Sequence, residues 1–146
     1  MATARMKITI PDVCFPFLIL LAVFLASGQS QIASPGFSFR MDKIAHFAVF
    51  GALATSVIRL PRLRESKWKG ALLVCVMVGI YGALDEFRQS FTPGRMVELD
   101  DWFADLLGAG VAVVLYQGWP FYRRVLERSP LDGFRRKPIE ASEPLS

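Results

Sequence analysis

Polar side chains that could bind or transform a ligand gather in three short segments of this chain, each beside an apolar run. The first segment, residues 42–46, holds the only histidine of the sequence. The second closes an apolar run at residues 85–95, and the third opens another at residues 98–105. Carboxylates, imidazole and guanidinium act as general acids and bases, metal ligands and anion-binding groups. Ionisable groups at membrane depth are costly, so they are usually functional or paired.

Helical spacing predicts that these groups share faces. Asp42 and His46 are four residues apart, as are Asp101 and Asp105, and positions i and i+4 lie on one side of a helix. We therefore expect the segments to converge on one cluster near a membrane surface. The candidate polar cluster consists of Asp42, Lys43, His46, Asp85, Glu86, Gln89, Arg95, Asp101 and Asp105.

Three interpretations of this cluster remain open. In a structural network, Arg95 or Lys43 would bridge to Asp85, Glu86 or Asp105 and hold the helices together. In a binding pocket, Arg95 and Lys43 would bind the anionic group of a lipid head, a wall precursor or an amphiphilic drug, while the acids fix them in place. His46 or Glu86 could also serve as the general acid or base of a membrane enzyme acting on a lipid phosphate or wall precursor.

The sequence predicts no metal ion and no cofactor. One histidine with scattered carboxylates lacks the ligand spacing of a zinc site, although an oxygen-rich group would suit magnesium or calcium. No Gly-Xaa-Ser-Xaa-Gly motif is present, so a serine hydrolase is not indicated. The two cysteines lie in apolar runs and indicate no redox role.

Composition favours a small membrane protein. The chain has 146 residues, 53% of them hydrophobic, and long apolar runs alternate with short charged blocks. The net charge of +4 does not indicate nucleic-acid binding, because the basic residues flank apolar runs and form no separate basic domain.

The apolar runs predict an all-α protein with four transmembrane helices. The first run borders in length on a signal peptide, but we favour a retained helix. Asp42 is the expected N-cap of the second helix, and Asp100 or Asp101 that of the fourth. A membrane domain would cover residues 1–119, followed by an interfacial segment and flexible cytoplasmic tail at 120–146. The expected helices lie at about 11–31, 44–60, 70–89 and 102–118.

Small residues and flanking charges predict how these helices pack and point. Gly79, Gly82 and Gly108 lie near the polar positions and would permit close helix approach. Lys and Arg number thirteen in the N-terminal segment, the second connection and the C-terminal segment together, but only four in the other two connections. The positive-inside rule then places both termini in the cytoplasm and the polar cluster on the outer side.

The segments DKIAHF (residues 42–47), DEFRQSFTPGR (85–95) and DWFADLLG (101–108) together resemble the VanZ-like family of small bacterial membrane proteins. The similarity covers about residues 13–118. At the position where the family pattern has Asn or Asp, this chain has Asp105, which adds a charge to the cluster.

This resemblance implies a multi-pass protein of the bacterial plasma membrane that belongs to the cell envelope. The family is named for a protein associated with resistance to teicoplanin, a lipid-tailed glycopeptide that acts at the outer membrane face. Expected partners are membrane lipids and a lipid-linked wall precursor or amphiphilic drug. The alternatives are an enzyme and an accessory subunit that binds other membrane proteins.

Overall fold

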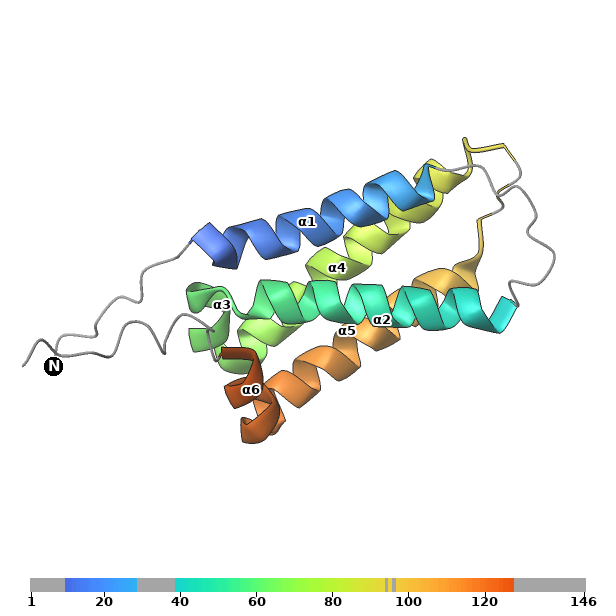
Figure 1. The fold of residues 1–146 in the computed structure, drawn as a ribbon. Coiled ribbons are helices and arrows are strands. Elements are labelled where there is room, and N and C mark those ends of the chain that lie inside the picture. Colours follow the sequence, from blue (N-terminus) through green and yellow to red (C-terminus); the bar gives the residue numbers. More distant parts are fainter. Residues whose placement is uncertain (1–9, 29–38, 94, 96, 128–146) are drawn as a thin grey trace, which may run out of the picture.

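A computed structural model describes residues 10–28, 39–93, 95 and 97–127 of the chain (Figure 1). In these residues every regular element is a helix, which confirms the all-α prediction. The elements are α1 (Ile10–Ser27), α2 (Phe39–Ile58), α3 (Pro61–Glu65), α4 (Lys67–Gln89), α5 (Leu99–Gly118) and α6 (Pro120–Glu127).

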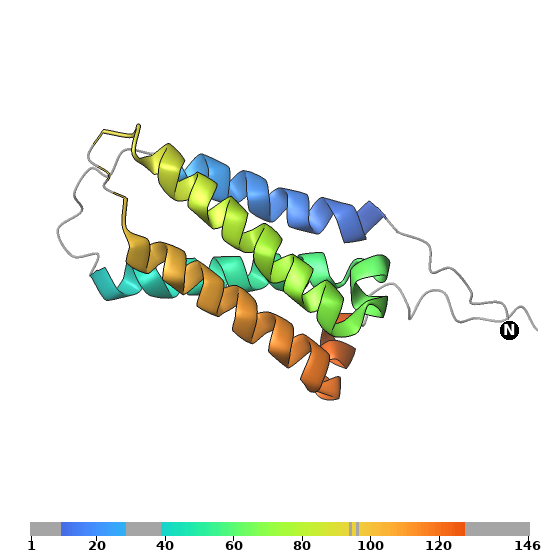
Figure 2. The same cartoon turned by 180° about the vertical axis from the view of Figure 1, so that it is seen from behind.

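The four long helices run alternately up and down the molecule (Figures 1 and 2). The end of α1, the start of α2, the end of α4 and the start of α5 therefore lie at one end of the bundle, and α3 and α6 lie at the other. The most extensive contact joins α2 and α5, and α4 packs against both. This alternation is what brings the three polar segments of the sequence to the same end.

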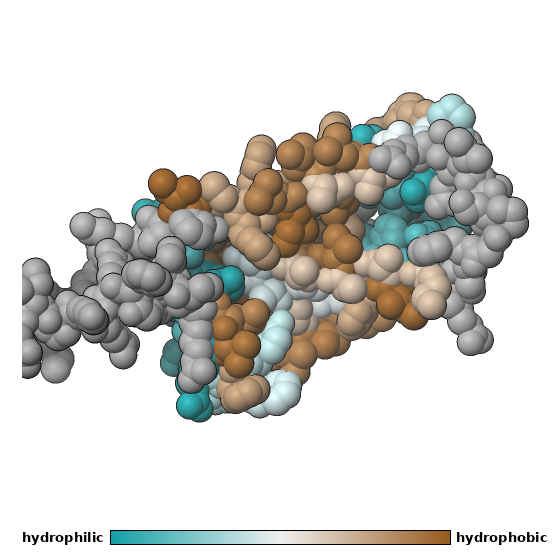
Figure 3. All heavy atoms as spheres, viewed as in Figure 1, coloured by the Kyte–Doolittle hydropathy of each residue, from teal (hydrophilic) through white to brown (hydrophobic). Residues whose placement is uncertain are grey.

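Among the described residues, two helices are long and apolar enough to cross a membrane, with spans at Met41–Ile58 and Lys67–Gln89. The apolar stretch of α1, Asp12–Ser27, is shorter. Less than half of each long span is buried inside the protein, and large apolar side chains cover much of the visible surface between the two ends of the bundle (Figure 3). Soluble monomers rarely expose apolar surface this extensively, so the described chain has the character of a membrane protein.

Glycines set the distance between the helices. A Cβ atom built on Gly108 would overlap the carbonyl oxygen of Phe47 and lie 2.9 Å from its carbonyl carbon, so α5 touches the backbone of α2 there. A Cβ on Gly82 would lie 2.7 Å from Oδ2 of Asp105. One on Gly79 would lie 2.7 Å from Leu106. Gly51, which the sequence analysis does not single out, faces the backbone of α5 beside Gly108.

The predicted helix starts and caps differ from those in the structure. Helix α2 begins at Phe39, so Asp42 lies inside its first turn instead of capping it. Helix α5 is preceded by Glu98 as N-cap residue, without a side-chain cap bond, and Asp100 and Asp101 lie in the first turn. Acidic side chains are favourable there because of the helix dipole. The Asp101 carboxylate also bonds to a lysine on α2, which competes with its use as a cap.

The remaining boundaries shift by smaller amounts. Helix α4 begins at Lys67, three residues before the predicted start, and ends at Gln89 as predicted. Helix α1 ends at Ser27, and the predicted end at residue 31 lies outside the described residues. The connection between α2 and α4 contains the short helix α3, which begins at Pro61. Proline suits the first position of a helix because the backbone N–H there has no partner within the helix.

Candidate functional site

All nine residues of the candidate polar cluster lie at the end of the bundle where α2 and α5 begin and α4 ends. Two groups of contacts are present, one between α2 and α5 and the other among α1, α4 and the loop that follows α4. The backbone N–H of Glu98 donates to Glu86 Oε2 over 3.0 Å and joins the end of α4 to the start of α5. The two groups are therefore parts of one connected network.

Lys43 is surrounded by carboxylates from the start of α5. Its Nζ lies 2.7 Å from Asp101 Oδ1, 3.2 Å from Glu98 Oε2 and 3.8 Å from Asp100 Oδ2. The prediction that Lys43 bridges to Asp85, Glu86 or Asp105 is therefore wrong, because the first turn of α5 supplies nearer acids. Three neighbouring carboxylates already compensate the ammonium charge, so Lys43 is also a poor binding group for a further anion.

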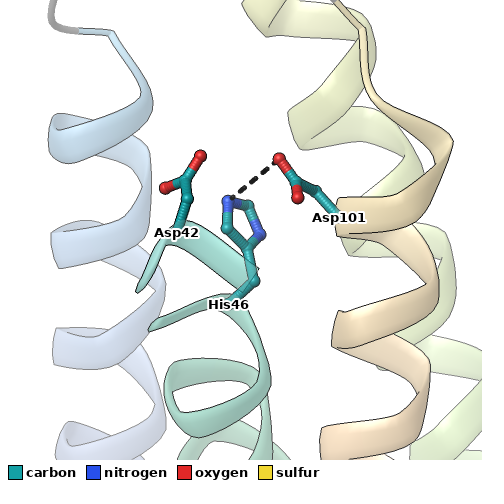
Figure 4. Close-up of side chains that lie close together, drawn as sticks. All are labelled: Asp42, His46 and Asp101. Atoms are coloured by element: carbon teal, nitrogen blue, oxygen red, sulfur yellow. Dashed lines mark ion pairs between the residues drawn. The ribbon is translucent and has the colours of Figure 1, made fainter. Parts of the chain in front are cut away.

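His46 is held between two acidic residues of α5. Its Nδ1 lies 2.9 Å from Oδ1 of Asp105, a distance at which an imidazole N–H donates to a carboxylate. Asp105 is 1% exposed, and the imidazole also stacks on Phe50. The other ring nitrogen, Nε2, lies 3.9 Å from Oδ2 of Asp101. As Figure 4 shows, Asp42 and Asp101 flank the imidazole from opposite sides.

Asp85 is the centre of the second group. It accepts hydrogen bonds from Ser27 Oγ (2.7 Å) and from Gln89 Nε2 (3.0 Å), and Arg88 Nε lies 3.9 Å from its other oxygen. Arg88 also donates to the backbone oxygen of Phe24 and lies over the Phe24 ring, which fixes its position beside α1. The sequence analysis missed Ser27 and Arg88, because neither the rotation of α1 nor its partner helix can be deduced from its uniformly apolar sequence.

Arg95 has a different partner from the one predicted. Its Nη1 donates to Gln89 Oε1 over 3.1 Å, and within the described part of the chain no carboxylate lies within ion-pair distance of the guanidinium. Its Nε is buried and has no hydrogen-bond partner there. The predicted bridge from Arg95 to Asp85, Glu86 or Asp105 is therefore absent from these residues, and the cation remains without an anionic partner.

A cavity of about 160 Å³ lies between α1, α2 and α4 and reaches both groups. Pockets that hold drug-sized ligands have volumes of ~300–1,000 Å³, so this polar cavity is the size of a small head group. A second hollow of about 360 Å³ runs along α2 and α5. Its polar residues are Thr55, Ser56, Arg59 and Tyr122, and no carboxylate or imidazole lines it. The walls of the polar cavity carry Ser27, Asp42, His46, Asp85, Gln89 and Arg95, together with the apolar residues Val23, Ala26, Ala45, Val49 and Phe50.

One set of side chains has the donor atoms of a metal site. Asp42, His46 and Asp101 each offer one ligand atom, and these atoms lie within 4.8 Å of one another. Spacing along the chain gives no signature of this metal site. Asp101 is more than fifty residues from His46, and only the pairing of α2 with α5 brings it alongside.

The comparison with known protein families gives a match to the family model described as VanZ/LLP1 over residues 6–122. The chain belongs to the VanZ/LLP1 family. This confirms the resemblance that the sequence motifs carry, and all three polar segments lie within the matched residues. Membership and the two apolar helices together indicate a membrane protein.

One relative of this chain comes from a eukaryote. An uncharacterized protein of the fission yeast Schizosaccharomyces pombe is 35% identical over 106 residues, which are 70% of this chain and 61% of the relative. The chain thus spans about three-fifths of the length of the curated relative it matches. No solved structure matches the chain.

Proposed function

We propose that this VanZ/LLP1 protein binds the small anionic head of a lipid or lipid-linked molecule in its polar cavity. The observation that carries the proposal is Arg95, whose guanidinium lines the cavity without a carboxylate partner among the described residues. The N–H donors of a planar guanidinium are spaced to form two parallel hydrogen bonds with a phosphate or carboxylate group. The apolar cavity wall from α1 and α2, which includes Val23 and Val49, suits the chain attached to such a head.

The proposal includes a membrane arrangement in which all four long helices cross the bilayer. At 1.5 Å per residue, the 18 residues of α1 and the 20 residues of α5 reach roughly 27 and 30 Å, close to the ~30 Å hydrocarbon core. The acids of α5 lie in its first two turns, which supports a position near the interface in this arrangement. The basic residues of α3 and α6 favour a cytoplasmic location for that end of the bundle, so the cavity would face outward in a plasma membrane.

Cavity size limits the class of ligand. A volume of about 160 Å³ is too small for a whole glycopeptide, so a lipid-tailed drug could place only a small group there. The yeast relative supports a ligand common to bacterial and fungal membranes, such as a phosphate-bearing lipid head, over one found only in bacterial walls.

The binding test uses purified protein in lipid nanodiscs, titrated with a short-chain phosphatidic acid and followed by native mass spectrometry. Arg95→Gln should weaken binding about 10–100-fold, because a hydrogen bond to a charged group contributes about 1.5–3 kcal/mol. The matched control is Arg124→Gln, which removes the same charge from an exposed position on α6 at the opposite end. Equal affinity of Arg95→Gln and the unchanged protein would refute the proposal.

A drug-sensitivity assay addresses the role in resistance that the family name suggests. Glu86→Gln and Arg95→Ala, expressed in a bacterial host at the level of the unchanged protein, should both alter sensitivity to a lipid-tailed glycopeptide if the cavity takes part. Unchanged sensitivity in both variants would confine the function to lipid binding.

A second candidate function is catalysis on a lipid phosphate. It is favoured by the His46–Asp105 pair, because a buried carboxylate that holds Nδ1 leaves Nε2 available as a general base beside the cavity. Purified protein would then release phosphate or a head group from a phospholipid, and His46→Gln would abolish the turnover. Absence of turnover over a range of pH would exclude this candidate and leave the binding function intact.

A further inference from the structure

The geometry points to a divalent transition-metal site formed by Asp42 and His46, which line the polar cavity, and by Asp101 beside them. This inference goes beyond the proposed lipid binding, since a metal ion can bind there whether or not the cavity accepts a head group. The three residues come from facing helices at one end of the bundle, as Figure 4 shows.

The donor atoms are close enough for one ion to gather them. Asp42 and His46 lie four residues apart on α2, and Asp101 faces them from α5. Zinc takes imidazole nitrogen at ~2.0–2.1 Å and carboxylate oxygen at ~2.0–2.2 Å, so two ligands of a tetrahedral ion are about 3.4 Å apart. His46 Nε2 and Asp101 Oδ2 are 3.9 Å apart, and small side-chain rotations would close the remaining gap.

Neighbouring groups hold the His46 imidazole and the Asp101 carboxylate in orientations that suit metal binding. The His46 Nδ1 contact with the buried Asp105 carboxylate directs Nε2 toward Asp42 and Asp101. Metal-binding histidines commonly bond a carboxylate through the other ring nitrogen. Lys43 bonds Oδ1 of Asp101 and leaves Oδ2 facing His46, so Asp101 can hold the lysine and an ion at the same time.

Asp42 supplies an independent observation. It is half-buried and lines the cavity, yet its carboxylate makes no hydrogen bond or ion pair with any described residue. The other acids of the candidate polar cluster each have a hydrogen-bond donor: Asp85, Glu86, Asp101 and Asp105. Among the described residues no cation therefore lies within ion-pair distance of the Asp42 carboxylate, and a metal ion would supply one.

The chemistry of the donors selects the class of ion. Imidazole nitrogen suits zinc, copper, iron and nickel more than it suits magnesium or calcium. Two carboxylates match the charge of a divalent cation, and the cavity beside them leaves room for a water or head-group oxygen as a further ligand. A metal ion there would offset the acidic wall that otherwise opposes an anion near Arg95.

Zinc binding to the full chain tests the inference. Protein purified in mild detergent, with its affinity tag removed and metal stripped by a chelator, is titrated with Zn²⁺ by calorimetry. We expect one saturable equivalent, with affinity reduced at least tenfold in Asp42→Asn and in His46→Gln. Asp100→Asn is the matched control, because Asp100 is exposed in the same turn of α5 as Asp101 and should leave the affinity unchanged.

Two further measurements keep the outcomes distinct. Circular dichroism and gel filtration of Asp42→Asn check the fold, which this change should not disturb because Asp42 makes no hydrogen bond or ion pair with the residues described. Bound Co²⁺ should show a visible absorption spectrum that is lost in His46→Gln. No saturable binding, or equal affinity in Asp42→Asn and the unchanged protein, would overturn the metal site. Arg95→Gln should still bind Zn²⁺, so a failure of lipid binding and a failure of metal binding are separable.

Discussion

Replacing Gly108 with alanine should separate the two helices that carry most of the candidate polar cluster. The new Cβ would overlap the carbonyl oxygen of Phe47 and lie 2.9 and 3.0 Å from its carbonyl carbon and Cα. Ordinary van der Waals contact begins near 3.4 Å, and the carbonyl oxygen is the closest of these atoms, so α5 must retreat from α2 by roughly 1 Å. The atoms in the way belong to the helix backbone, which cannot rotate aside as a side chain would.

The free-energy cost can be built from two contributions. Overpacking a close contact typically costs about 1–3 kcal/mol. The same displacement lengthens the contact between His46 and Asp105, and hydrogen bonds to charged groups contribute about 1.5–3 kcal/mol. Alanine returns up to ~1 kcal/mol through its higher helix propensity. The expected net loss is about 1.5–5 kcal/mol of unfolding free energy.

Unfolding by sodium dodecyl sulfate in mixed micelles, followed by circular dichroism, measures this loss. The matched control is Gly110→Ala, two residues further along α5, where a Cβ would meet nothing within 4 Å. That change should leave stability equal or raise it by up to ~1 kcal/mol. If Gly108→Ala proves as stable as Gly110→Ala, the close approach of α2 and α5 is not a feature of the folded protein.

Three further predictions concern topology and individual contacts. The first uses a chain whose native cysteines are replaced. Ser90→Cys should react with an impermeant thiol reagent from outside the cell and Ser66→Cys only after permeabilisation, because these exposed residues flank opposite ends of α4. Labelling of both residues from one side would contradict the spanning arrangement. Trp102→Phe removes the 2.9 Å hydrogen bond from the indole N–H to the backbone oxygen of Gly79 on α4. In the same assay the unfolding free energy should fall by about 0.5–1.5 kcal/mol. An unchanged unfolding free energy would show that the bond is not formed. Glu127→Gln breaks a partly exposed ion pair with Arg64 and should cost less than ~1 kcal/mol; a larger loss would mean that α6 contributes more to the fold than this contact shows.

Apolar runs and alternating topology were enough to predict the helical class and the end of the bundle where the polar segments meet. Partner choice was harder to predict, because it depends on how far each helix rotates about its axis. The structural-network interpretation pairs Lys43 with carboxylates on α4 or deeper in α5. In the structure Lys43 instead bonds Asp101 in the first turn of α5 and Glu98 just before it. Helix starts were missed for a related reason, since polar residues at the ends of α2 and α5 look like caps in the sequence but form an additional helical turn.

The pairing of α2 with α5 also has a consequence for how the protein is made. Lys43 and His46 contact residues that lie 55 to 59 positions later in the chain. At synthesis rates of ~5–20 residues per second, the ribosome needs roughly 3–12 s to produce those partners after it has added Lys43 and His46. Throughout that interval the charged start of α2 must remain in contact with water or with the insertion machinery, so the nascent chain passes through an incomplete intermediate that a membrane protease or chaperone could recognise.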